Sequence, residues 1–215
     1  MELHEALDQI AVIRRTLASS QVFRGYGARP MAVCSAMACG GSALQATFIP
    51  RPLDDFGSFL TLWIFVAALG LTVSLADVWW RYRHSPLSLW REDAWLALTQ
   101  FLPCLGAGAL ATLAVVRVLP EARALLPGLW SMFFGLGLFA SIGMLPHGMS
   151  AVAAWYVTAG GVAIALFSRD AALSPWSMVV TFGVGQAGAA VAHYYQPATS
   201  SGCNDAQPAT EHDDE

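Results

Sequence analysis

The sequence predicts an all-α integral membrane protein, an up-and-down bundle of six transmembrane helices. Three observations predict this fold class. The 215 residues are 56% apolar and only 12% charged, about half the charge content of an ordinary soluble domain. Six apolar stretches each reach about 20 residues, the length that an α-helix needs to cross a hydrocarbon core of roughly 30 Å. The connections between them are short, so we expect sequential helices to pack as antiparallel hairpins.

Residues 1–30 are expected to form a cytoplasmic amphipathic helix and a linker before the first span. Within residues 1–20, four apolar side chains recur at coiled-coil-like spacing: Leu3, Leu7, Ile10 and Leu17. This pattern favours a short helix that lies on the membrane surface, pairs with a partner helix or folds back on the cytoplasmic loops. Contact with a protein partner, or with a second copy of the chain, is therefore expected through residues 1–20.

The six expected spans form one transmembrane domain over residues 31–195, in contact with the lipid bilayer. They cover residues 31–50, 58–80, 94–118, 125–145, 149–168 and 175–195. Residues 196–215 are rich in Pro, Ser, Gly and acidic side chains. A segment of this composition cannot bury enough apolar surface to become ordered, so we expect a disordered acidic tail.

The distribution of arginine predicts how the spans are oriented. All 11 cationic residues are arginines. The larger group lies before the first span or between the second and third: Arg14, Arg15, Arg24, Arg29, Arg81, Arg83 and Arg91. The smaller group lies on the opposite side: Arg51, Arg117, Arg123 and Arg169. Because the side richer in arginine stays in the cytoplasm, we expect both termini there.

The composition also excludes classes of function. Without lysine, the chain cannot form a Schiff base with retinal or pyridoxal phosphate, or supply the lysine of a Walker motif. The net charge of −4 comes from the acidic tail, and no face gathers the arginines that nucleic-acid binding requires. The cysteines form no Cys-x-x-Cys pair: Cys34, Cys39, Cys104 and Cys203. We therefore expect no nucleic acid, no cofactor and no structural metal site.

Small residues predict where helices pack in a membrane, because they let two backbones approach closely. In the first span such residues recur every four positions, and the sixth span has two comparable pairs. We expect helix packing at Ala32, Ala36, Gly40, Gly185, Gly188 and Ala189.

Polar residues that share helical faces predict a lined interior. Ser35, Ser42 and Gln45 fall on one face of the first span. In the third span, the ring of Pro103 removes the backbone hydrogen bond to the Thr99 carbonyl and is expected to open the helix, either to line a ligand or for structural reasons alone. The candidate ligand-binding cavity consists of Gln100, Pro103, Gln186, Asp77 and His193.

Asp77 is the one acidic residue well inside an expected span. An intramembrane carboxylate is a functional candidate because an unpaired charge there is costly. Arg81 lies four residues later, so an ion pair across one helical turn is the simpler alternative. A metal or proton-transfer site with the histidines of the same side would need a convergence in space, because no two of these residues have ligand spacing: His84, His147 and His193.

No motif in the sequence supports catalysis. The chain has no His-Glu-x-x-His zinc helix, no Gly-x-Ser-x-Gly nucleophile turn and no paired acids inside the spans. We therefore expect no catalytic residue, and an intramembrane enzyme is the third of the functional alternatives.

Four segments carry a resemblance to known proteins: residues 22–26 (VFRGY), 101–104 (FLPC), 126–130 (LPGLW), and 174–176 (SPW) with 182–186 (FGVGQ). Over most of residues 1–195 the chain resembles a group of bacterial multipass membrane proteins of unknown function. The resemblance implies the bacterial inner membrane and supports the six-span architecture, but it implies no catalytic or binding residue.

Two functions follow as expectations. The first is a non-enzymatic accessory or sensory membrane subunit that acts through a partner. The alternative is a small-solute binding or transport component, because six spans with a small-residue face on the first are similar in outline to the substrate-binding subunits of energy-coupling vitamin importers.

Overall fold

The computed structural model describes residues 28–84, 89–145, 148–166 and 169–195, and every regular element within them is helical. The long helices are α2 (Ala28–Phe48), α3 (Phe56–His84), α4 (Leu89–Arg117), α5 (Leu126–Ala140) and α6 (Met149–Leu166). The short helices between them are η1 (Pro120–Leu125), η2 (Ile142–Met144) and α7 (Arg169–Ala172). The last run comprises α8 (Pro175–Met178), the π-helical turn η3 (Val179–Gly183) and α9 (Val184–Tyr194). The expected N-terminal helix and acidic tail lie outside the described residues.

Five helical segments are long and apolar enough to cross a membrane: Ala28–Phe48, Phe56–Trp80, Thr99–Arg117, Pro120–Ala140 and Met149–Leu166. They coincide with the first five expected spans to within a few residues. The all-α fold class is confirmed over the described residues, and five of the six expected stretches are helices long and apolar enough to cross a membrane.

The sixth expected stretch, residues 175–195, is helical but interrupted. The run begins at Pro175, where the missing N–H of proline costs no hydrogen bond. In η3 the backbone N–H of Val184 donates to the carbonyl of Val179, five residues back instead of four. Because η3 divides the run, neither α8 nor α9 alone reaches the length of a span.

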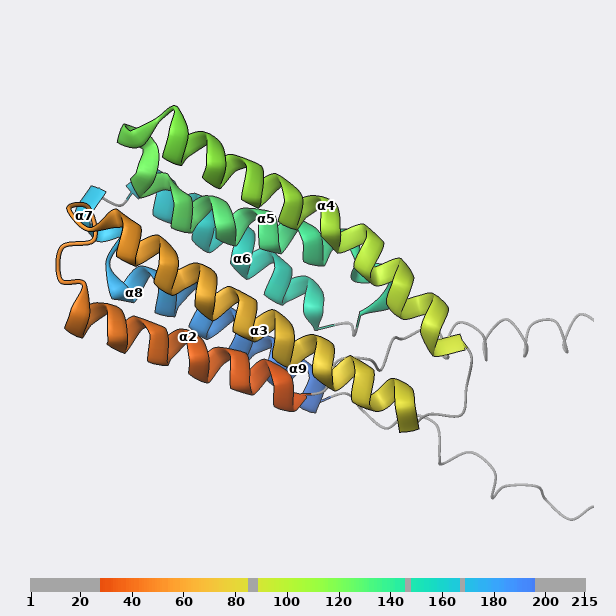
Figure 1. Ribbon diagram of the computed structural model, residues 1–215. Helices are drawn as coiled ribbons and strands as arrows, with labels where there is room; N and C mark the ends of the chain where they lie inside the picture. Colours follow the sequence, from red (N-terminus) through yellow and green to blue (C-terminus); the bar gives the residue numbers. More distant parts are fainter. Residues whose placement is uncertain (1–27, 85–88, 146–147, 167–168, 196–215) are drawn as a thin grey trace, which may run out of the picture.

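The long helices lie side by side and alternate in direction (Figure 1). The start of α2, the end of α3, the start of α4 and the end of α9 lie at one end of the bundle. The α2–α3 connection, η1 and α7 lie at the other. The antiparallel order expected of an up-and-down bundle is therefore present in the described elements.

One expected hairpin is missing. Helix α2 packs on α3, α4 on α5 and α5 on α6, as predicted for sequential neighbours. Helices α3 and α4, however, do not form a packed pair over their described residues, so the prediction was wrong for this pair. Helix α2 lies between α3 and the α8–α9 run, and its contact with that run joins the first and last parts of the bundle.

Glycines account for the tight packing of α5 on α6. A Cβ at Gly128 would lie 2.8 Å from the Gly160 carbonyl oxygen, and a Cβ at Gly160 would lie 2.6 Å from the Gly128 carbonyl oxygen. A Cβ at Gly135 would lie 2.9 Å from the Ala153 carbonyl oxygen. Side chains would therefore force the two backbones apart at these levels, which is the role of small residues in membrane helix pairs.

The apolar side chains divide into two buried clusters and a broad apolar exterior. One cluster lies near the α2–α3 connection and includes Phe59, Trp63, Leu126 and Leu173. The second includes Met31, Met149, Val152, Tyr156 and Ala189. Large apolar side chains remain exposed on the outside of the bundle, among them Phe65, Leu110 and Leu166. Such an exterior suits lipid.

Helix α4 passes through Pro103 without a break. Pro103 therefore does not end the helix, and the expected local opening stays a prediction. The ring lies on an exposed face, where it removes one backbone donor without requiring a neighbouring helix to move aside.

Candidate functional site

Tyr156 of α6 lies at the centre of an aromatic chain that crosses the bundle. Its side chain is 0% exposed. The ring centroid lies 4.8 Å from that of Phe134 in α5 and 5.7 Å from that of Phe182 in η3. Phe134 in turn meets Phe101 of α4 edge to face, with centroids 5.2 Å apart. Rings from α5 and η3 thus pack against the phenol, and Phe101 of α4 packs behind Phe134.

Gly185 of α9 admits the phenol of Tyr156. A Cβ at this position would collide with Cζ of Tyr156 and would lie 2.7 Å from its hydroxyl oxygen. A residue with any side chain would push Tyr156 away from α9 or shift the helix. The hydroxyl therefore faces the backbone of α9 at Gly185, one residue before Gln186.

Two buried polar atoms of this region lack a hydrogen-bond partner among the described residues. They are the hydroxyl oxygen of Tyr156 and Oε1 of Gln186. A buried hydroxyl or amide oxygen without a partner costs about 1–3 kcal/mol. Such groups are rare in folded proteins, and each one calls for an explanation, such as a bound molecule.

Helix α2 completes the region from the other side. The Ser35 hydroxyl donates to the Gly183 carbonyl over 2.8 Å. The Cys34 thiol donates weakly to the Gly70 carbonyl of α3 over 3.7 Å. We call this region the Tyr156 seam; it comprises Ser35, Tyr156, Gly185 and Gln186.

The π-helical turn η3 adjoins the Tyr156 seam. A π-helical turn disturbs the regular ladder of backbone hydrogen bonds and leaves carbonyl oxygens open to outside donors. Trp155 Nε1 donates to the Val180 carbonyl over 3.1 Å, and Ser35 supplies the Gly183 carbonyl. Side chains from α6 and α2 therefore bind both ends of η3 and fix its position against the Tyr156 seam.

The five residues of the expected cavity lie on three helices. Gln186 and His193 are half-buried in α9, and the Nδ1 atom of His193 lies 2.8 Å from the Ala189 carbonyl oxygen. Asp77 is half-buried in α3. Gln100 is half-buried and Pro103 is exposed, both in α4. Of the five, Gln186 belongs to the Tyr156 seam, and a cavity that the five share stays a prediction.

The interior expected along α2 contains a closed polar contact. Gln45 is 0% exposed. Its Nε2 donates to the Leu173 carbonyl over 2.7 Å, and its Oε1 accepts from Trp63 Nε1 over 2.8 Å. Ser42 bonds back to the Ala38 carbonyl of its own helix. These groups are satisfied within the chain and offer nothing to a ligand.

The two sets of expected packing residues differ in their environment. Gly185 meets Tyr156, Ala189 is buried, and a Cβ at Gly188 would lie 3.6 Å from Val152. On α2, by contrast, Ala32, Ala36 and Gly40 are all exposed. The α9 residues therefore pack within the chain, and the α2 residues face away from it.

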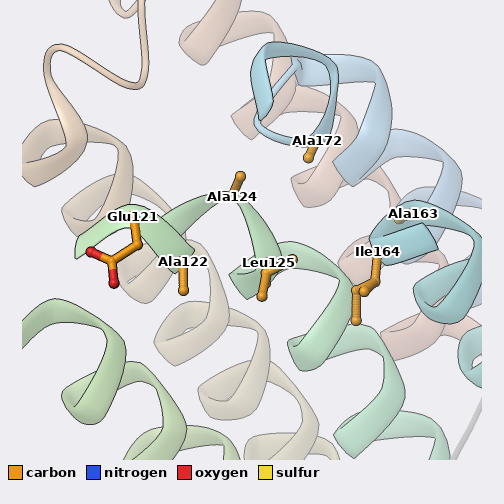
Figure 2. Close-up of a pocket in the computed structure, with 7 residues that line it drawn as sticks. All are labelled: Glu121, Ala122, Ala124, Leu125, Ala163, Ile164 and Ala172. Carbon is orange, nitrogen blue, oxygen red and sulfur yellow. The ribbon is translucent and has the colours of Figure 1, made fainter. Parts of the chain in front are cut away.

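A hollow of about 310 Å³ opens at the end of the bundle that carries η1 and α7 (Figure 2). Its lining residues are Glu121, Ala122, Ala124, Leu125, Ala163, Ile164 and Ala172. Figure 2 shows the Glu121 carboxylate directed away from Ala163, Ile164 and Ala172. Ligand sites need a few convergent polar groups to fix orientation, so the Tyr156 seam is the better candidate. Among the described residues, no group of three His, Cys, Asp or Glu residues is placed to hold a metal ion.

Sequence reasoning missed Tyr156, although the chain carries a signal for it. The other tyrosines lie at or outside the ends of the expected spans: Tyr26, Tyr82, Tyr194 and Tyr195. Tyrosine is typical of the membrane interface, so a tyrosine near the middle of an apolar stretch indicates a special environment.

Comparison of the chain with protein-family models, with curated proteins and with solved structures finds no match. The resemblance to a bacterial membrane family therefore stays a prediction.

Proposed function

We propose that the chain is a six-span integral membrane protein of the bacterial inner membrane that acts as a non-enzymatic accessory or sensory subunit, through contact with a partner protein. The observation that carries this proposal is the outer face of α2. The five helices that are long and apolar enough to cross a membrane supply its setting.

The outer face of α2 is unusual for a surface that meets lipid. Small residues lie exposed along it, at Ala32, Ala36, Cys39, Gly40 and Ala43, beside the larger exposed side chains of Val33 and Leu44, and a Cβ at Gly40 would meet nothing within 4 Å. The outer face of the neighbouring α3 instead exposes large apolar side chains at Ile64, Phe65 and Leu69. Small residues in a membrane helix let a second backbone approach closely. Because no helix of the described chain covers this face, a second polypeptide is the natural occupant.

The α8–α9 run has 20 residues from Pro175 to Tyr194, about 30 Å at about 1.5 Å per residue, and serves as the sixth span. Arginine distribution supports cytoplasmic termini. Residues 1–20 would then lie on the cytoplasmic side, ahead of α2 in the sequence, where they extend the contact with the partner or with a second copy.

The experiment places larger side chains on the outer face of α2 and measures how much of the partner copurifies with the chain. Ala36→Leu with Gly40→Leu places two large side chains where the structure leaves space. The matched control, Gly106→Leu with Ala109→Leu, makes the same change on the exposed face of α4. We expect copurification in mild detergent to recover one specific companion, or a second copy of the chain, with the unchanged chain and with the control.

The α2 variant should lose this companion at least tenfold while its thermal unfolding temperature stays close to that of the unchanged chain. Recovery of the same companion with both variants contradicts the role of α2. Repeated recovery of the chain alone, in a monomeric state, contradicts the accessory-subunit function.

A second candidate function is the binding of a small solute. The observation that favours it is the side-chain oxygen of Gln186, which is buried in α9 without a hydrogen-bond partner among the described residues. In this alternative Gln100, Pro103 and Asp77 contribute to the same cavity.

A further inference from the structure

Tyr156 occupies a position where phenylalanine would fill the same space. The neighbours of its ring are apolar: Met31, Met149, Val152, Ala189, Phe134 and Phe182. The hydroxyl is the polar part of this side chain, and it lies among apolar neighbours. It has no hydrogen-bond partner among the described residues. Buried polar groups are nearly always satisfied, by water or another bound molecule where the protein itself supplies no partner. The hydroxyl therefore indicates a bound molecule.

The atoms near the hydroxyl define the chemistry of that molecule. The phenol can donate or accept a hydrogen bond, whereas the amide oxygen Oε1 of Gln186 can only accept one. The hydroxyl faces Gly185. Gln186 shares its helical face with Phe182, Ala189 and Ala190, which all pack in the cluster that contains Tyr156. A molecule that accepts from Tyr156 and donates to Gln186 would satisfy both atoms.

We infer that the Tyr156 seam is a binding site for one small, uncharged molecule with both a donor and an acceptor. Water, small alcohols and small primary amides share this chemistry. The molecule is uncharged because the surrounding cluster is apolar and offers no counter-charge. It is small because Tyr156 and Gly185 are already in contact. This inference does not depend on the outer face of α2, so either proposal can fail without the other.

The test uses the full chain in detergent and three variants. Tyr156→Phe removes only the hydroxyl, and Gln186→Leu removes the amide oxygen. Tyr194→Phe makes the same change as the first variant at an exposed tyrosine and serves as the control. Infrared difference spectra between the unchanged chain and Tyr156→Phe isolate the bands of the Tyr156 hydroxyl and of any molecule bonded to it.

Two probes distinguish water from a solute. In H₂¹⁸O, a water bound to Tyr156 gives an O–H stretching band that shifts with the isotope and is absent in Tyr156→Phe. Formamide carries both a donor and an acceptor, whereas N,N-dimethylformamide lacks the donor. If the occupant is a solute, formamide shifts the Tyr156 bands, binds about fivefold to tenfold more weakly to Tyr156→Phe and to Gln186→Leu, and binds equally to Tyr194→Phe.

Either response supports the site and identifies its occupant. Tyr156 bands that respond neither to H₂¹⁸O nor to formamide overturn the inference, whether the phenol then proves to be free or bonded to another group of the protein. Equal responses to formamide and N,N-dimethylformamide overturn the role of Gln186 and, with it, the donor-and-acceptor chemistry.

Discussion

At Gly185, the addition of one methyl group would turn a close helix contact into a collision with Tyr156. A Cβ there would lie 2.7 Å from both Cε2 and the hydroxyl oxygen of Tyr156. Because Phe134 and Phe182 hold the ring from other sides, Tyr156 cannot move aside freely. We expect Gly185→Ala to lower the free energy of unfolding by about 1–3 kcal/mol, the usual cost of overpacking. Thermal unfolding in detergent measures this change.

The control for this prediction is Gly161→Ala, in α6. A Cβ at Gly161 would meet nothing within 4 Å, so only the higher helix propensity of alanine acts there, and stability should hold or rise slightly. Combining Gly185→Ala with Tyr156→Leu should recover part of the loss, because the branched side chain ends before the position of Cζ. Equal stability of the Gly185→Ala and Gly161→Ala variants would show that the Tyr156 contact is not tight.

Gln45 illustrates what spacing along a sequence reveals about a single residue. Its helical register with Ser35 and Ser42 correctly predicts a face directed into the bundle. The register cannot predict its partners, because Leu173 lies 128 residues away in the chain. The same limit applies to Tyr156, whose environment depends on residues from α2, α5, η3 and α9.

At the scale of elements, the contact between α2 and η3 includes one hydrogen bond between distant segments. The Ser35 hydroxyl donates to the Gly183 carbonyl, 148 residues away, whereas the Ser42 hydroxyl donates to Ala38 within α2. We expect Ser35→Ala to lower the free energy of unfolding by about 0.5–1.5 kcal/mol, since an interhelical bond is lost. Ser42→Ala, the matched control, should change stability by less, because its bond lies within one helix.

Hydrogen exchange adds a local readout to this prediction. Loss of the Ser35 bond should speed amide exchange over Val179–Gly183 more than elsewhere in the chain, since η3 would lose one of its two side-chain donors. Uniform changes in exchange, or equal losses of stability in the two serine variants, would contradict a specific role for this bond.

Length and hydropathy were sufficient to predict five helices, because each stretch is uniformly apolar over about the thickness of a bilayer. The sixth stretch is also long enough to cross a bilayer, but no pattern in the sequence predicts a π-helical turn within it. Its position depends on donors from other helices, Trp155 and Ser35. The missing contact between α3 and α4 was equally hard to predict. Which helices pack together depends on how all the helices are arranged in space, and not only on their order along the chain.

At the scale of the whole molecule, the number of spans determines on which sides of the membrane two distant segments lie. The connection between α2 and α3 follows the first span, and Cys203 follows the last. If the α8–α9 run crosses the membrane, five crossings separate these two positions, and they lie on opposite sides. If it does not, four crossings separate them, and they lie on the same side. The side of each position is therefore a direct test of six spans against five.

We expect opposite sides, with Cys203 in the cytoplasm. The labelling experiment starts from a chain in which Cys34, Cys39 and Cys104, all free thiols, are replaced by alanine. One version keeps Cys203, and the other carries Cys203→Ala with Asp54→Cys, at an exposed position of the α2–α3 connection. A membrane-impermeant maleimide applied to intact cells should label only the Asp54→Cys version, and both versions after lysis. Labelling of both versions in intact cells, or of neither, would mean an odd number of spans, and labelling of Cys203 alone would keep six spans but reverse the orientation that arginine predicts.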